Sequence, residues 1–291
     1  MTYNLLTLES LSLDRVTLAL SQCFHVGVED VDVADEATDQ DLRNWDALVL
    51  CEKTTVLGDV STSLDIYLQE SVEPQPSERE LASALARATR SAVLFPAEEA
   101  VPSAYWLAAE DGVITRARLN SSDDKQPRYT IDVVEAPVAG LPHVRVDRIS
   151  EVVREQQVPT PVGAAFAAHV QRLFPEEAKT PGTPHWYASN RLGAWEKLVL
   201  QMEAGWAPGG WFPSDLYLER LEARDELDEV SDRLPESVTS LLGNALAPLD
   251  TLFTRMTVAD TDQVCRELAR AQGITPGRGW WWDRRPDPLP W

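Results

Sequence analysis

The hydrophobic period of this chain changes once along its length, and that change constrains the fold more than any other feature. Up to about residue 135, short apolar runs alternate with polar residues, as is typical of β-strands. After the proline-bearing segment 136–142, apolar residues recur every three to four positions, as in amphipathic helices. The sequence therefore predicts an α+β protein with two domains, residues 1–142 and residues 143–291.

The first domain is predicted to contain a mixed or antiparallel sheet with two helices. The helices are expected at residues 10–24 and 77–90, and Ser77 and Glu80 have the spacing of a capping box at the start of the second. An Asp-Gly pair at residues 111–112 indicates a β-hairpin. The expected strands are 3–9, 26–33, 47–51, 64–68, 92–95, 104–109, 113–119 and 129–134.

The second domain is predicted to be mostly α-helical and closed by an irregular tail rich in Trp and Pro. Eight of the ten tryptophans lie between Trp186 and Trp291, so we expect this half to have its own aromatic core. The tail from Gly277 to Trp291 includes three consecutive tryptophans, and because their exposure is unfavourable we expect it to pack on the preceding helices. The expected helices are 147–157, 162–174, 189–205, 214–232, 236–256 and 260–271.

The formal net charge of −21 is concentrated at the beginning of the chain. Residues 1–80 contain 17 Asp and Glu against 4 Lys and Arg. Such a field repels nucleic-acid phosphates and anionic lipids, so it argues against nucleic-acid and membrane-surface binding. The same field attracts a basic protein and speeds its encounter. The alternative interpretation is that the acidity only maintains solubility.

The acidic residues are densest just after the first expected helix, and seven of them are candidates for partner binding. A metal site built on Asp30 and Asp32 is the sharper alternative, but the glycine and terminal glutamate of an EF-hand loop are missing at the required spacing. A merely solvated acidic face is the other alternative. The candidate partner-binding residues are Glu29, Asp30, Asp32, Asp35, Glu36, Asp39 and Asp41.

Catalytic, cofactor and metal motifs are not found in the sequence. The three cysteines are widely spaced, the four histidines form no zinc-binding pair, and no nucleophile elbow, P-loop or dinucleotide fingerprint occurs. We therefore assign no catalytic, cofactor-binding or metal-binding residue. The sequence has neither a signal-peptide pattern nor an apolar run of 18 residues, so a cytoplasmic location is expected.

The leading functional hypothesis is a non-enzymatic acidic protein that neutralises a basic protein partner. Its composition resembles that of acidic bacterial immunity proteins, which inhibit toxins, although the likeness covers no motif. An enzyme or small-molecule-binding protein with a site between the halves, near His185, Trp186 and Trp211, is the first alternative. The second is a subunit of a larger assembly that is anchored by the aromatic tail.

Overall fold

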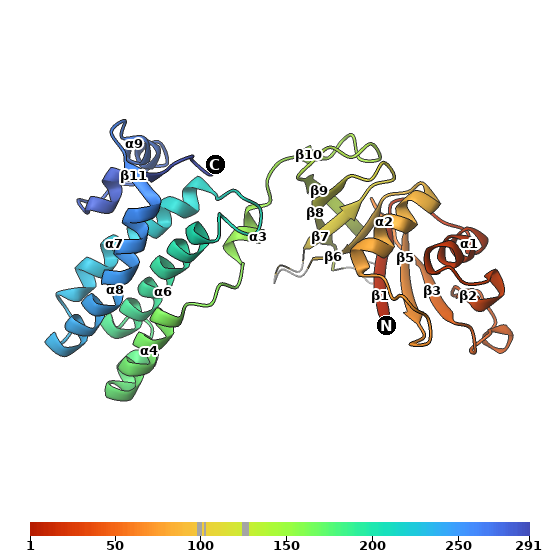
Figure 1. Ribbon diagram of the computed structural model, residues 1–291, viewed down its shortest axis with the longest axis horizontal. Helices are drawn as coiled ribbons and strands as arrows, with labels where there is room; N and C mark the ends of the chain where they lie inside the picture. Colours follow the sequence, from red (N-terminus) through yellow and green to blue (C-terminus); the bar gives the residue numbers. More distant parts are fainter. Residues whose placement is uncertain (98–100, 102, 124–127) are drawn as a thin grey trace. The chain divides into compact units, whose positions relative to one another are not determined.

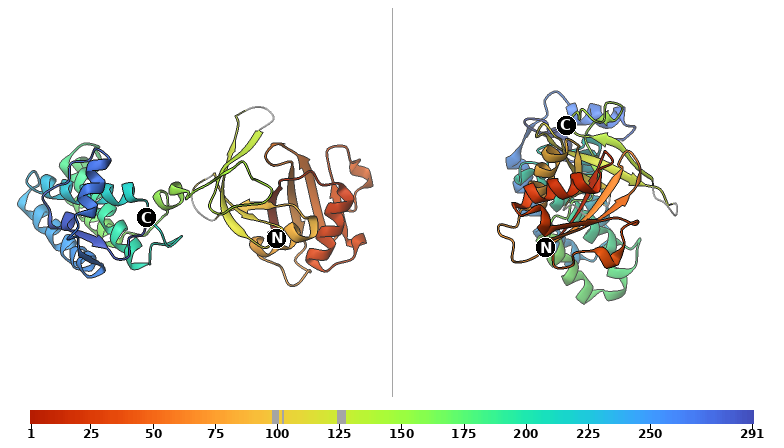
Figure 2. Two further views of the ribbon diagram at one scale, coloured as in Figure 1. Left: turned by 90° about the horizontal axis from the view of Figure 1, so that it is seen from above. Right: turned by 90° about the vertical axis from the view of Figure 1, so that its right-hand side faces the viewer.

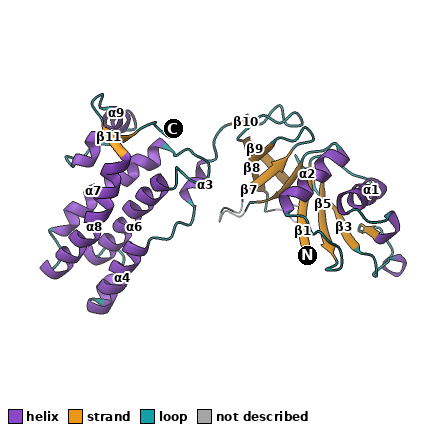
Figure 3. Ribbon diagram, viewed as in Figure 1, coloured by secondary structure: helices purple, strands orange, loops and turns teal. Residues whose placement is uncertain are grey.

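The computed structural model describes residues 1–97, 101, 103–123 and 128–291. The contacts between residues divide the chain into two compact units, Met1–Val152 and Val153–Trp291. Strands gather in the first unit and most helices in the second, as Figure 3 shows. The predicted α+β class, with a sheet followed by a helical half, is confirmed. The predicted division into domains 1–142 and 143–291 stays a prediction.

The first unit is built on one mixed sheet with the strand order β10-β9-β8-β7-β6-β1-β5-β3-β2, and β4 lies beside β9 (Figure 1). Most neighbouring strands are antiparallel, whereas β2 runs parallel to β3, and both β4 and β10 run parallel to β9. The strands are β1 Thr2–Thr7, β2 Val31–Ala34, β3 Val49–Thr55, β4 Leu57–Gly58, β5 Thr62–Leu68, β6 Val93–Pro96, β7 Ala104–Ala108, β8 Ile114–Ser121, β9 Arg128–Val134 and β10 Arg145–Val146.

Two helices, α1 Leu13–Phe24 and α2 Glu78–Thr89, cover one face of this sheet (Figure 1, Figure 2). The predicted capping box is present, because the side chains of Ser77 and Glu80 each accept a bond from the other's backbone N–H. Both helices bury apolar side chains against alternate residues of β1, β3 and β5. The predicted hairpin is also confirmed, since β7 pairs with β8 across Gly112, whose φ is +92°.

The expected strand at residues 26–33 is wrong at its beginning. Residues Val28–Asp30 form a 3₁₀ turn, η1, in which the Asp30 N–H donates to the Gly27 carbonyl, and β2 begins only at Val31. Asp30 therefore precedes the strand that contains Asp32. A second 3₁₀ turn, η2 Gln40–Leu42, follows β2.

The second unit packs long helices around an aromatic and aliphatic core. The helix expected at 147–157 is short and spans the division between the units, and the helix expected from residue 189 begins earlier, at Pro184. The Thr183 hydroxyl accepts a bond from the Trp186 N–H there, and proline at the first helical position needs no N–H partner. The helices are α3 Ser150–Arg154, α4 Pro161–Leu173, α5 Pro175–Lys179, α6 Pro184–Glu203, α7 Ser214–Ser231, α8 Glu236–Met256 and α9 Val264–Ala271.

The Trp- and Pro-rich tail closes this unit, as the sequence predicted. The tail forms a 3₁₀ turn, η3 Trp280–Asp283, and then a strand, β12 Arg284–Pro286, which pairs with β11 Thr257–Ala259. Trp281 and Trp282 are buried in the core. Arg224 on α7 stacks on the Trp281 ring, with its guanidinium carbon 4.3 Å from the ring centroid.

Candidate functional site

The seven acidic residues that the sequence singles out lie in and around β2, at the edge of the sheet. Glu29 and Asp30 belong to η1, Asp32 to β2, and the other four to the segment between β2 and β3. Their carboxylates fall into two groups. Those of Asp32, Asp35 and Asp39 accept hydrogen bonds within the chain, and no such bond is found, among the described residues, for the carboxylates of Glu29, Asp30, Glu36 and Asp41.

Asp32 anchors the segment that follows it. Its carboxylate accepts bonds from the Arg43 side chain, with an Nε–Oδ2 distance of 2.8 Å, and from the Asn44 N–H, at 3.1 Å. The side chains of Arg43 and Asp32 are 6% and 15% exposed, so this ion pair is largely shielded from water. Asp32 therefore stabilises the loop between β2 and β3.

Asp35 and Asp39 shape the same loop. The Asp35 carboxylate accepts bonds from the Ala37 N–H and the Thr38 hydroxyl, and the Asp39 carboxylate accepts one from the Asp41 N–H at the start of η2. Bonds of this local kind fix turns. The exposed acidic residues are thus presented on an ordered segment.

This region carries acidic charge without exposed basic charge to balance it. Between Arg15 and Arg79 the sequence contains only two basic residues, Arg43 and Lys53. Both are mostly buried: Lys53 is 8% exposed, and the Arg43 side chain is 6% exposed. The exposed carboxylates of this stretch consequently face solvent as a field of one sign.

Two further acidic residues lie on the sheet face opposite α1 and α2. Glu52 of β3 stands directly opposite Asp65 of β5, and both are exposed. Like charges in such a cross-strand pair are destabilising, and among the described residues neither carboxylate has an ion-pair partner. The nearby thiol of Cys51 responds to them: burial raises its pKa, Asp65 and Glu52 raise it further, and Arg43 lowers it.

We define the acidic surface as the exposed or half-exposed acidic residues of residues 29–65 that lack a structural role. Three of them, Asp46, Glu52 and Asp65, are not among the candidates predicted from the sequence. The alternation of Leu64, Asp65 and Ile66 contained the signal, because a strand whose alternate residues are apolar turns the others to its open face. The acidic surface consists of Glu29, Asp30, Glu36, Asp41, Asp46, Glu52 and Asp65.

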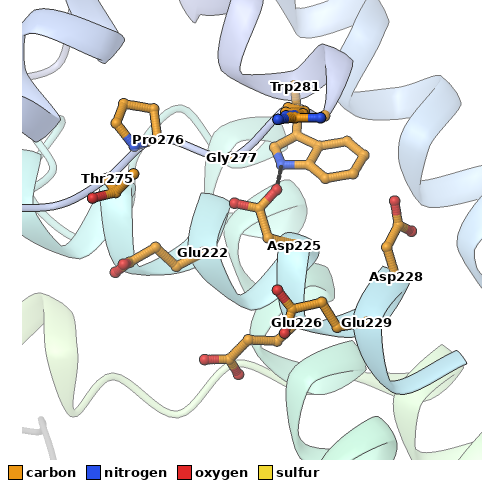
Figure 4. A pocket seen from close by; sticks show the side chains of 11 residues that line it. Glu222, Asp225, Glu226, Asp228, Glu229, Thr275, Pro276, Gly277 and Trp281 are labelled. Carbon is orange, nitrogen blue, oxygen red and sulfur yellow. Dashed lines mark hydrogen bonds between the residues drawn. The ribbon is translucent and has the colours of Figure 1, made fainter. Parts of the chain in front are cut away.

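A second acidic site is a cleft of about 640 Å³ in the helical unit, between α7 and the segment 275–279 (Figure 4). Asp225 lies at its centre, and its carboxylate accepts hydrogen bonds from two indole N–H groups of the tail. The nitrogen–oxygen distances are 3.0 Å for Trp281 and 2.7 Å for Trp282. Burial raises the pKa of Asp225, and the two indole bonds oppose that rise. Glu226 pairs with Arg191. Asp225 therefore holds the tail, whereas Glu226 and Asp228 pair with arginines of the helices.

Repulsion among the carboxylates of this cleft can be tested at Glu222. Burial raises its pKa, and the carboxylates of Glu226, Asp225 and Glu219 raise it further. The folded state therefore binds this proton more tightly than the unfolded state, so stability falls as pH rises above the ordinary value of 4.5. Glu222→Gln is expected to raise the thermal unfolding midpoint at pH 7.5, and the gain should shrink toward pH 5. Glu229→Gln, at an exposed position of the same helix, is the control; an equal gain in both variants would contradict the explanation.

A second cleft, of about 450 Å³, lies in the first unit, and Asp59, Ser91 and His143 are among the residues that line it. The His143 Nε2 is 3.6 Å from the Asp59 carboxylate, which also accepts the Ile131 N–H. The Ser91 hydroxyl, however, is buried and bonded to the Glu9 N–H and the Ala92 carbonyl. In the described part of the chain no hydrogen bond joins Ser91 to His143, so the pair needed to activate a nucleophile is not assembled.

The residues of the alternative small-molecule site pack within the helical unit. His185 is buried at the start of α6 and stacks on Phe174 with ring centroids 4.5 Å apart. Trp186 contacts Tyr187 edge to face, and Trp211 packs against the core. Within the described residues, no group of three or more His, Cys, Asp or Glu side chains is arranged to hold a metal ion.

Comparisons with protein-family models, with curated proteins and with solved structures found no match to this chain. Among the described residues, no helix combines the length and the apolar character that crossing a membrane requires. The geometry and charge of the acidic surface are therefore the features that indicate a function.

Proposed function

We propose that this protein is an acidic, non-enzymatic binding protein that recognises a basic protein. The observation that carries the proposal is the uncompensated acidic surface: its carboxylates are exposed, while the two basic residues of the same stretch are buried. A partner with Lys or Arg side chains would relieve the repulsion between Glu52 and Asp65 on binding. Its encounter would also be accelerated by the long-range field.

A bacterial toxin-immunity protein is the most concrete form of this proposal. Such a protein acts in the cytoplasm of the producing cell and occupies a toxin by charge complementarity. The division of labour among the carboxylates supports a binding role, because Asp32, Asp35 and Asp39 order the segment while the others remain available. An ordered surface loses less conformational entropy on binding than a flexible one.

Charge reversal tests the proposal. A variant with Glu29, Asp30, Glu36 and Asp41 all changed to Lys is expected to lose the basic proteins that the wild-type chain captures from a cell extract, quantified by mass spectrometry. Because these four carboxylates accept no hydrogen bond from the part of the chain that the structure describes, the variant should keep its thermal stability. For a captured partner, association at low salt should slow by about 10- to 100-fold, and the wild-type rate should fall as salt is added.

The matched control reverses four exposed acidic residues of the helical unit, Glu155, Glu229, Asp232 and Asp262. It changes the net charge by the same amount but leaves the acidic surface intact. Equal loss of partners in the two variants would mean that net charge alone governs binding. Partners that are neutral or acidic, or that both variants retain, would overturn the proposal.

A further inference from the structure

The stretch that carries the acidic surface also contains an exposed tryptophan, which is not among the candidates predicted from the sequence. Trp45 lies between β2 and β3 and is 57% exposed, the largest exposure among the large apolar side chains of the described residues. Exposed Trp is costly to solvate, and Trp is strongly enriched among the residues that dominate binding energy at protein interfaces.

Trp45 is held in place rather than free to move. It lies in a turn that the Ala47 N–H closes by donating to the Asn44 carbonyl at 3.1 Å. The Asn44 N–H donates in turn to the Asp32 carboxylate, and the Gln69 side chain donates to the Ala47 carbonyl at 2.9 Å. These bonds tie the turn to β2 on one side and to the end of β5 on the other.

The indole ring itself is oriented by Arg43. The guanidinium carbon lies 4.5 Å from the ring centroid, and the same guanidinium is ion-paired with Asp32. Arg43 thus occupies one face of the ring. More than half of the residue is nevertheless exposed, and the negative π face of an indole attracts a cation.

A second exposed aromatic residue extends this surface along the sheet. Tyr67 of β5 is 46% exposed, and it stands opposite Leu50 of β3, which in turn stands opposite Asp32 of β2. This row therefore runs across the open face from Tyr67 to the residue that anchors Arg43 and Trp45. Glu52 and Asp65 form the next row toward the interior of the sheet.

We infer that Trp45 is the aromatic anchor of the acidic surface and receives an Arg or Lys side chain of a basic protein. The inference rests on the proposed function and specifies its chemistry: a cation stacks on the open indole face while neighbouring carboxylates, such as that of Asp46, neutralise it. A second copy of this chain is a poor occupant, because two surfaces of the same negative sign repel each other.

The test uses an arginine-rich peptide, acetyl-(Arg-Gly-Ser)₄-amide, and the same peptide with citrulline in place of arginine. The indole N–H signals of the ¹⁵N-labelled full chain are followed by NMR, and the Trp45 signal is identified by its loss in Trp45→Phe. Addition of the arginine peptide is expected to shift the Trp45 signal, and the citrulline peptide should not. Trp280, 41% exposed in the helical unit, is the internal control and should not move.

Affinity measurements complete the test. Trp45→Ala is expected to weaken binding of the arginine peptide by about 3- to 30-fold, with Trp45→Phe intermediate, while the unfolding midpoint stays close to that of wild type. An unmoved Trp45 signal, or equal affinity in wild type and Trp45→Ala, overturns the inference. If capture of basic proteins still depends on Glu29, Asp30, Glu36 and Asp41 in that case, the proposed function stands without the anchor. If capture is insensitive to those residues, the proposed function fails.

Discussion

Deletion of residues 280–291 is expected to unfold the helical unit. The deletion removes Trp281 and Trp282, which are 2% and 0% exposed, and leaves Asp225 without the two indoles that it binds. Truncation of a single buried Trp to Ala typically costs about 3–5 kcal/mol. Two such losses together are comparable to the roughly 5–15 kcal/mol that stabilises an ordinary domain.

Further contacts of the tail are lost in the same deletion. The Arg284 side chain donates to the Thr257 hydroxyl at 2.8 Å and to the Thr254 carbonyl at 2.7 Å, and β12 completes the pair with β11. The Phe212 N–H donates to the Pro290 carbonyl at 3.0 Å. The tail therefore bonds to three separate segments, which distinguishes it from a frayed terminus.

Circular dichroism at 222 nm during heating measures the loss of helical structure. Two single substitutions separate the contributions of individual tail tryptophans. Trp282→Ala, at a fully buried position, should lower the unfolding midpoint strongly, whereas Trp280→Ala, at a position 41% exposed, should lower it much less. A truncated chain that stays folded but no longer assembles with other subunits would contradict the clamp and favour the role of an assembly anchor.

Asp250→Ala is expected to destabilise the helical unit strongly. Asp250 on α8 accepts bonds from the Arg224 side chain, at 3.3 Å and 3.0 Å, and from the Trp195 indole, at 3.0 Å. The Arg224 side chain is only 8% exposed and Trp195 is fully buried. Removal of Asp250 leaves the buried guanidinium with the exposed Asp228 as its remaining partner and deprives the Trp195 indole N–H of its acceptor. Loss of one partner from a buried pair typically costs about 3–5 kcal/mol.

Chemical denaturation of Asp250→Ala, Asp250→Asn and Asp228→Ala measures this effect. A loss of about 3–5 kcal/mol corresponds to a fall of roughly 10–20 °C in the unfolding midpoint for a unit of this size. Asn keeps an acceptor oxygen, so its loss should be smaller. Asp228 also pairs with Arg224, at 2.5 Å, but its side chain is 62% exposed, so its removal should cost about 1 kcal/mol or less. Equal losses at the two positions would show that Asp250 has no special role.

Local sequence signals predicted the elements that depend on neighbouring residues. The capping box at Ser77 and the hairpin at Gly112 each depend on residues a few positions apart, and both are found. The start of β2 was misjudged because alternation alone does not register the hydrogen bond from the Asp30 N–H to Gly27 that closes a 3₁₀ turn. Local patterns also do not reveal with which carboxylate an arginine will form an ion pair.

The candidate site, too, was predictable in part from local sequence and in part only from contacts between distant segments. The concentration of acidic residues in 29–46 is a property of the sequence, and it predicts a basic partner. The selection of Glu29, Asp30, Glu36 and Asp41 as available, and of Asp32 as structural, required the position of Arg43. Trp45 was overlooked because a single tryptophan in a polar loop gives no sign of its exposure or its support.

By itself the sequence determined the order of a sheet part and a helical part, the excess of acidic charge and the need to cover three consecutive tryptophans. These properties follow from composition and from periods of two and 3.6 residues, which act over a few positions of the chain. Only the tertiary structure decided that Asp225 binds the tail indoles, that Glu52 faces Asp65, and that Arg43 and Lys53 are buried. These three features depend on residues that are far apart in sequence or on which side chains become buried. Strand register and helix packing bring such residues together only when the chain folds.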